Sequence, residues 1–228
     1  MERRYQEHIA TKEIKQLLEQ LIDPSLPPQQ YAMVMYKLGY AFGPLIEQQL
    51  KHPTAVTIAC TVEDADHLAA GMIDYLEKKD NTVYLNVFWN KRFKPGGISV
   101  APIVKQYRDK GSTHTHTLVI LKSIISSSCV VRTNLTRLIE EFVPDQIFVA
   151  APVLWKGSLQ NLESEFDQAV SSRFQYLYFA EDEVRTTDGT IIPGIGGDIY
   201  QRLGFSGQDD KNRFIPQIVK DRRQHIGR

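Results

Sequence analysis

The feature that most constrains the fold of this chain is an alternation of short apolar runs with helical patterns. The apolar runs are 55–60, 82–88, 118–121, 146–151 and 175–179, and helical patterns occupy 63–78, 133–142 and 156–169. Short continuous apolar runs are typical of strands that are covered on both faces. Strands that alternate with helices form parallel sheets through crossover connections. We therefore predict an α/β fold with a mainly parallel sheet flanked by helices.

Two helical patterns, 8–22 and 28–49, precede the alternation and are separated by a proline-rich break. The segment 89–117 does not fit the alternation, and a long irregular insertion in such a domain is typically a functional lid or poorly ordered. We predict helices in 1–50 that pack on a core of 51–208, with 89–117 as an inserted arm. The polar, basic tail 209–228 is left open between a helix and a frayed end.

Composition excludes several classes of protein. The 27 basic residues balance 27 acidic residues, so net charge indicates no polyanionic partner. No apolar run approaches the roughly 18 residues that a membrane helix needs, and the first residues lack the apolar core of a signal peptide. We expect a cytoplasmic protein without membrane association. Cys60 and Cys129 form no disulfide framework or zinc motif, and we interpret them as small buried residues.

The strongest motif is Thr190-Ile-Ile-Pro-Gly-Ile-Gly-Gly-Asp-Ile-Tyr-Gln-Arg202, which follows Val149-Ala-Ala-Pro152 in the chain. Together the two segments resemble the uracil phosphoribosyltransferases, a branch of the type I phosphoribosyltransferase fold. The resemblance implies that main-chain groups of Ile192, Gly194 and Gly196 read a pyrimidine base, since glycine lets a ligand approach the backbone closely. It also implies a role for Asp198 near ribose and metal, a homodimer, and a pyrimidine, nucleotide or phosphoribosyl pyrophosphate (PRPP) ligand.

The PRPP loop of that family is altered here. The family carries an acidic residue and glycines after this strand, whereas the run 118–121 is followed by Lys122 and later by Ser126, Ser127 and Ser128. A cation thus replaces an acceptor for ribose hydroxyls, and left-handed backbone conformations cost more without glycine. We assign a phosphate site to the three serines, because their hydroxyls can donate at a helix start. The alternative is a plain strand-to-helix connection with a serine N-cap.

Two further positions look altered relative to the family. The pyrophosphate turn would fall at 64–69, which is acidic here and suits Mg²⁺ better than pyrophosphate. The acidic arm would correspond to 90–94, in which Lys91, Arg92 and Lys94 are basic. Such a segment could bind RNA or be a solvated loop. His114 and His116 have the spacing of a metal pair, but no further ligands are evident, so we predict no metal site there.

Three functions follow as hypotheses. The first is a ligand-binding or regulatory protein on this scaffold that has lost most transferase activity, a pseudoenzyme. The second is an active phosphoribosyltransferase, a pentosyltransferase that makes a UMP-like nucleotide, and only this hypothesis requires Mg²⁺. The third is an RNA-binding regulator that uses the basic arm.

Overall fold

The computed structural model of the chain describes residues 3–50, 54–93 and 99–226. Its strands are β1 (Arg3–Tyr5), β2 (Ala55–Thr61), β3 (Thr82–Asn90), β4 (Ile103–Arg108), β5 (Thr117–Leu121), β6 (Ile124–Ile125), β7 (Gln146–Trp155), β8 (Phe174–Asp182), β9 (Val184–Arg185) and β10 (Ile191–Ile192). Its helices are α1 (Lys12–Ile22), α2 (Pro28–Glu47), α3 (Val62–Asp64), the π-helix η1 (Ala65–Ala69), α4 (Ala70–Glu77), α5 (Cys129–Ile139), α6 (Ser158–Glu163), α7 (Gln168–Ser171), α8 (Ile199–Arg202), α9 (Gln208–Arg213) and α10 (Gln217–Ile226).

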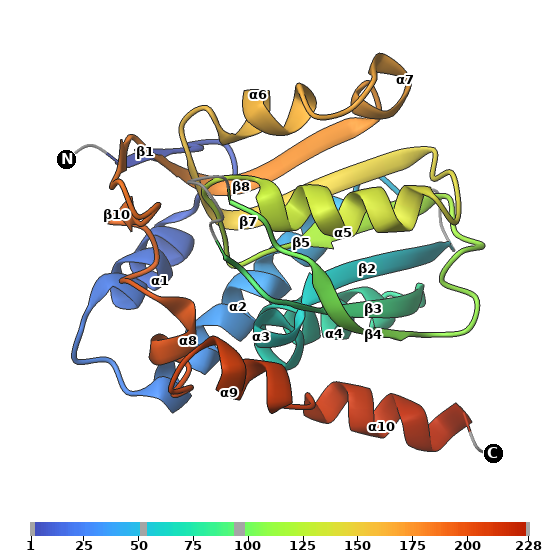
Figure 1. The fold of residues 1–228 in the computed structure, drawn as a ribbon, viewed down its shortest axis with the longest axis horizontal. Coiled ribbons are helices and arrows are strands. Elements are labelled where there is room, and N and C mark those ends of the chain that lie inside the picture. Colours follow the sequence, from blue (N-terminus) through green and yellow to red (C-terminus); the bar gives the residue numbers. More distant parts are fainter. Residues whose placement is uncertain (1–2, 51–53, 94–98, 227–228) are drawn as a thin grey trace.

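A mostly parallel sheet forms the centre of the molecule, as predicted (Figure 1). The strand order is β1-β8-β7-β5-β2-β3-β4. All neighbours from β3 through β2, β5 and β7 to β8 are parallel, whereas β4 and β1 pair antiparallel at the two edges. Numbered along the chain, the parallel strands have the doubly wound order 2-1-3-4-5, so the connections change direction between β2 and β5.

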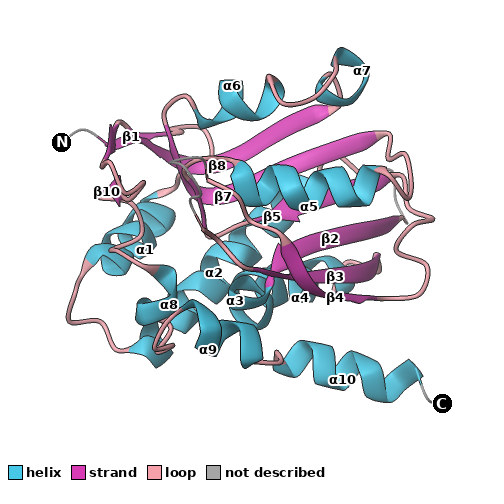
Figure 2. Ribbon diagram, viewed as in Figure 1, coloured by secondary structure: helices cyan, strands magenta, loops and turns pink. Residues whose placement is uncertain are grey.

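Helices cover both faces of this sheet (Figure 2). One face packs against α1, α2, η1 and α4, and the opposite face packs against α5 and α6. The strands between them are buried almost throughout, which explains their continuous apolar sequences. No helix of the described residues is long and apolar enough to cross a membrane.

The helix α1 shows how local sequence directs the N-terminal segment. Thr11 caps α1, because its hydroxyl accepts a hydrogen bond from the backbone N–H of Ile14 at 3.3 Å. Leu17, Leu18 and Leu21 then form the buried face of the helix. The next helix, α2, begins at Pro28, where a missing backbone N–H costs nothing.

Two sequence predictions need correction, and the alternative left open for the tail is settled. The arm 89–117 is not irregular throughout, because β4 pairs with β3 from Asn86↔Arg108 to Asn90↔Ile103. The predicted helix 156–169 is two short helices, α6 and α7. The segment 209–228 contains α9 and α10, and α10 is docked on the core: Asp66 accepts hydrogen bonds from the backbone of Gln217 and Ile218 at 2.8 and 2.9 Å.

Candidate functional site

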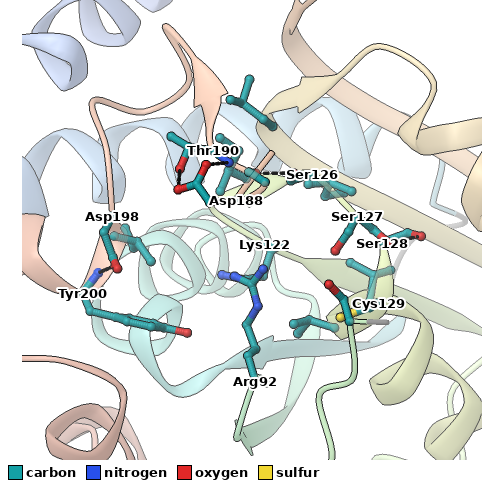
Figure 3. A pocket seen from close by; sticks show the side chains of 18 of the residues that line it. Arg92, Lys122, Ser126, Ser127, Ser128, Cys129, Asp188, Thr190, Asp198 and Tyr200 are labelled. Atoms are coloured by element: carbon teal, nitrogen blue, oxygen red, sulfur yellow. Dashed lines mark hydrogen bonds between the residues drawn. The ribbon is translucent and has the colours of Figure 1, made fainter. Parts of the chain in front are cut away.

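A cavity of about 350 Å³ lies at the carboxyl ends of β2 and β5, where the strand order reverses (Figure 3). Sheets of this kind bind ligands at this reversal, because the connections diverge to opposite faces and leave a crevice. Four segments line it: Glu63 after β2, the stretch after β3, the connection from Lys122 to the start of α5, and the C-terminal loops around 188–191 and 197–200.

Lys122 does not stand free at the end of β5 but belongs to a buried charge cluster. Its Nζ lies 2.6 Å from Asp64 Oδ2 and 3.1 Å from Glu63 Oε1, and it donates to Ser123 Oγ at 3.0 Å. The side chains of Lys122, Glu63 and Asp64 are exposed by 9%, 3% and 1%. The acidic stretch after β2 therefore neutralises the cation after β5, a pairing that the sequence alone did not indicate.

A second lysine completes this cluster. Lys211 Nζ on α9 lies 3.6 Å from Glu63 Oε2 and donates to the backbone oxygen of Asn90 at 2.9 Å. Burial would raise the pKa of Glu63, but the charges of Lys122 and Lys211 lower it to about 2. Burial would likewise lower the pKa of Lys122, but Asp64 and Glu63 raise it above its usual range. For Lys211, burial prevails and lowers the pKa. Glu63 and Lys122 are thus a charged pair at neutral pH.

The predicted phosphate residues Ser126, Ser127 and Ser128 also line the cavity (Figure 3). Ser126 Oγ donates to the backbone oxygen of Gly189 at 2.6 Å, and Ser128 Oγ donates to that of Ser127 at 2.7 Å. These two hydroxyls are therefore already used, whereas Ser127 Oγ has no such partner in the described part of the chain. Ser128 adopts the left-handed conformation at φ 55°, although it is not glycine. The turn that we expected to be costly is formed.

The helix α5 begins directly after this turn. A serine, Ser128, occupies the N-cap position as the alternative interpretation expected, but its side chain makes no cap hydrogen bond. Within the described residues, no hydrogen bond uses the backbone N–H groups of Cys129, Val130 or Val131, which all border the cavity. Unpaired N–H groups at a helix start attract anions, and the helix dipole adds to the attraction.

Arg92 of the basic arm points into the cavity (Figure 3). Its backbone is held on both sides by Gln208, whose Oε1 accepts from Arg92 N–H and whose Nε2 donates to Arg92 O at 3.0 Å. No acceptor among the described residues contacts the guanidinium. Lys91 instead faces α9, where it lies 3.3 Å from Asp209. Lys94 lies outside the described residues.

The residues assigned to base reading, Ile192, Gly194 and Gly196, are not part of the cavity wall. Gly194 N–H donates to Asp182 Oδ2 at 2.8 Å, and Gly194 O accepts from the guanidinium of Arg3. Gly196 N–H donates to Pro193 O at 3.3 Å. The main-chain groups of Gly194 thus anchor the loop to β1 and β8, and the bond of Gly196 closes a turn within the loop. The neighbouring Ile191, Gly197 and Asp198 line the cavity instead.

Asp198 does line the cavity, and it is joined there by Tyr200, which the sequence analysis did not single out. Asp198 caps α8, because its Oδ1 accepts from Tyr200 N–H at 2.8 Å. Burial raises the pKa of Tyr200 above its usual range, so its phenol stays neutral. The sequence gives only a weak indication of Tyr200 as a site residue, namely an N-cap aspartate two residues before it. The geometry of the loop is what turns both side chains toward the cavity.

The described carboxylates do not form a protein-held Mg²⁺ site. Those of Glu63 and Asp64 pair with lysine, one oxygen of Asp198 caps α8, and Asp188 accepts from the hydroxyls of Thr186 and Thr190. No group of three or more potential metal ligands occurs among the described residues. His116 pairs with Asp145 at 3.0 Å on the surface, and Cys60 and Cys129 are buried free thiols.

Comparison with known proteins identifies the fold but no family. No protein-family model and no curated protein matches the chain. The chain is similar in structure to the AQ2163 protein from Aquifex aeolicus, with a TM-score of 0.69 and 15% identity over 86% of this chain and 96% of that one. The two chains share a fold.

Two hypoxanthine phosphoribosyltransferases align more loosely. The Staphylococcus aureus enzyme has a TM-score of 0.46 and 11% identity over 66% of this chain and 74% of that one. The L. donovani hypoxanthine-guanine enzyme has a TM-score of 0.42 and 10% identity over 67% of this chain and 78% of that one.

Proposed function

We propose that this protein is a phosphoribosyltransferase-like ligand-binding or regulatory protein that binds a phosphate monoester in the cavity and has lost PRPP transfer. The observation that carries the proposal is the pairing of Lys122 with Asp64 and Glu63 at the ends of the two central strands. The sequence resemblance to uracil phosphoribosyltransferases supplies the scaffold.

The pairing removes the group that PRPP would need at this position. The resemblance places an acceptor for the ribose hydroxyls directly after β5, but Lys122 has no acceptor and its ammonium is already surrounded by oxygen atoms. The described carboxylates also offer no Mg²⁺ cage. A ligand that does not require a carboxylate here or a bound metal fits the cavity better.

The phosphate end of the ligand would bind between α5 and Arg92. The free N–H groups of 129–131, the Ser127 hydroxyl and the Arg92 guanidinium are all donors without partners in the described structure. Phosphate accepts charge-assisted hydrogen bonds from such donors, and the helix dipole favours its charge. Asp188 and Asp198 also line the cavity, but Asp188 accepts hydrogen bonds from the hydroxyls of Thr186 and Thr190, and one oxygen of Asp198 caps α8. Glu63 is neutralised by lysine.

An active transferase is the second candidate, and two observations favour it. Ser128 adopts the left-handed turn that a phosphate loop needs, and Asp198 lines the cavity where the resemblance puts an acidic residue. In that case Mg²⁺ would enter with PRPP, Asp198 would face the ribose, and a pyrimidine would lie near Ile192 and Gly194. RNA binding through Lys91, Arg92 and Lys94, and a homodimer, stay predictions.

Calorimetric titration of the purified protein tests the proposal. Inorganic phosphate and ribose 5-phosphate should bind without Mg²⁺, and the variant Arg92→Ala should weaken binding about ten- to a hundredfold, the loss of one charged hydrogen bond. The matched control is Lys91→Ala, which removes the adjacent positive charge outside the cavity and should change affinity less than about threefold.

Two outcomes would decide against the proposal. Release of pyrophosphate from PRPP when Mg²⁺ and a pyrimidine base are added would establish an active transferase. Absence of binding by every phosphorylated probe would exclude the cavity as a phosphate site.

A further inference from the structure

Tyr200 presents a hydroxyl to the cavity that makes no hydrogen bond with the residues the structure describes. The residue lies on α8 and is exposed by 9%. No described residue forms a hydrogen bond with its hydroxyl, whereas the buried hydroxyl of Tyr31 donates to Ile195 O at 3.0 Å. The Tyr200 hydroxyl faces the cavity, so a ligand that enters there can reach it, and tyrosine hydroxyls at such sites commonly bind polar groups.

The ring of Tyr200 is held firmly in this position. Its backbone N–H is bound by Asp198, and the ammonium of Lys211 lies 4.9 Å from the ring centroid. Lys211 is itself fixed by Glu63 and by the backbone of Asn90. A tyrosine with so little freedom can form a directional hydrogen bond at little entropic cost.

The position of Tyr200 relative to the phosphate donors sets the size of the ligand. Figure 3 shows Tyr200 and Asp198 on one side of the cavity, Ser127 and Ser128 on the other, and Arg92 between them. A free phosphate held at the start of α5 would not reach across the cavity. The volume of about 350 Å³ is in the range of small organic ligands.

We infer that Tyr200 is a specificity-determining residue that donates a hydrogen bond to the part of the ligand beyond its phosphate. The inference rests on the proposed function, which places the phosphate at α5. The ligand is a phosphate monoester with an oxygen-rich group of about the size of a sugar. Asp198 lies beside Tyr200 and supplies the acceptor for a hydroxyl of the same group.

The experiment compares two probes, inorganic phosphate and ribose 5-phosphate, with the wild-type protein and with Tyr200→Phe. Phenylalanine keeps the ring and its contact with Lys211, so the variant should fold. Tyr200→Phe should weaken binding of ribose 5-phosphate about three- to tenfold and leave phosphate affinity unchanged. The control is Tyr36→Phe, which removes a hydroxyl that binds Asp74 outside the cavity and should affect neither probe.

The outcomes separate this inference from the proposed function. If the wild-type protein binds both probes and Tyr200→Phe weakens neither, or weakens both equally, the inference is wrong while the phosphate site stands. If the wild-type protein binds neither probe, the proposed function fails and the inference fails with it.

Discussion

Lys122 Nζ lies 2.6 Å from Asp64 Oδ2, and this buried ion pair joins the carboxyl ends of the two central strands. The pair lies on the reversal of strand order, the place where the fold would otherwise offer its chemistry to a ligand. Here the two groups satisfy one another. The charges at this point are therefore paired within the protein.

Removing Lys122 should destabilise the protein strongly. Lys122→Met would leave Glu63 and Asp64 without their main counter-charge, and breaking a buried pair on one side costs about 3–5 kcal/mol. Lys122→Asp should be worse, because it would bury three carboxylates together. Urea denaturation measures the free energy of unfolding. The control Lys156→Met removes an exposed pair with Glu183 and should lower the unfolding free energy by less than about 1 kcal/mol. Equal losses in the two variants would show that the buried Lys122 cluster stabilises the protein no more than an exposed ion pair does.

Acid should weaken the same cluster. The pKa of Glu63 is about 2 in the folded protein and 4.5 as its ordinary value. The unfolded chain therefore binds the proton more readily, so the contribution of Glu63 is fully present above about pH 4.5 and is lost as the pH falls toward 2. Unfolding free energies from pH 6 to 2.5 should fall less steeply in Glu63→Gln than in the wild type. Equal pH dependence of the unfolding free energy in the two proteins would mean that the pKa of Glu63 is not lowered in the folded state.

Arg3 should be far more important than its neighbour Arg4. The guanidinium of Arg3 binds both oxygens of the fully buried Asp182, at 2.9 and 2.8 Å, and also contacts Gly194 O. Arg3→Ala would leave Asp182 as an unpaired buried charge and should lower the unfolding free energy by about 3–5 kcal/mol. Arg4 lies on the same strand but is exposed, so Arg4→Ala should change the unfolding free energy by less than about 0.5 kcal/mol. Thermal melts of the two variants that coincide would contradict this role.

Two adjacent glycines should respond differently to alanine. A Cβ on Gly196 would meet the backbone oxygen of Leu21 at 2.1 Å, and a Cβ on Gly197 would meet nothing within 4 Å. Both have positive φ, so alanine at Gly197 should cost about 1–2 kcal/mol from conformation alone. At Gly196 a steric cost of about 1–3 kcal/mol should be added, because backbone cannot move aside easily. Chemical denaturation of the two variants checks the order, and a larger loss at Gly197 would contradict it.

Local patterns predicted the sheet well and the arm poorly. The apolar run 55–60 corresponds to β2 and 146–151 to the first part of β7, because strands that are buried on both faces need continuous apolar sequence. The arm strand β4 has only one strongly buried residue, Tyr107, so its sequence shows no such run. Its pairing depends on β3 being present beside it.

The sequence predicted only part of the candidate site, because some of the predicted residues face away from the cavity. Ser127, Ser128 and Asp198 came from the resemblance and line the cavity. Gly194 and Gly196 came from the same motif as Asp198, but Gly194 O binds Arg3 and Gly196 packs against Leu21. A motif identifies a loop, but which side of the loop faces a cavity depends on what packs against its other side. Arg3 and Tyr31 decide this here, and both are far away in sequence.

The sequence by itself determined the alternation of strands and helices, and with it a parallel α/β sheet, because hydrophobic periodicity is a local property. It also determined that a lysine follows the third parallel strand. Only the tertiary structure decided that this lysine is neutralised by Glu63 and Asp64, that Arg92 rather than Lys91 faces the cavity, and that Tyr200 lines it. Ion pairs and cavity walls are formed by residues that are distant in sequence. The energy of an ion pair also depends on how deeply it is buried, which the local sequence does not show.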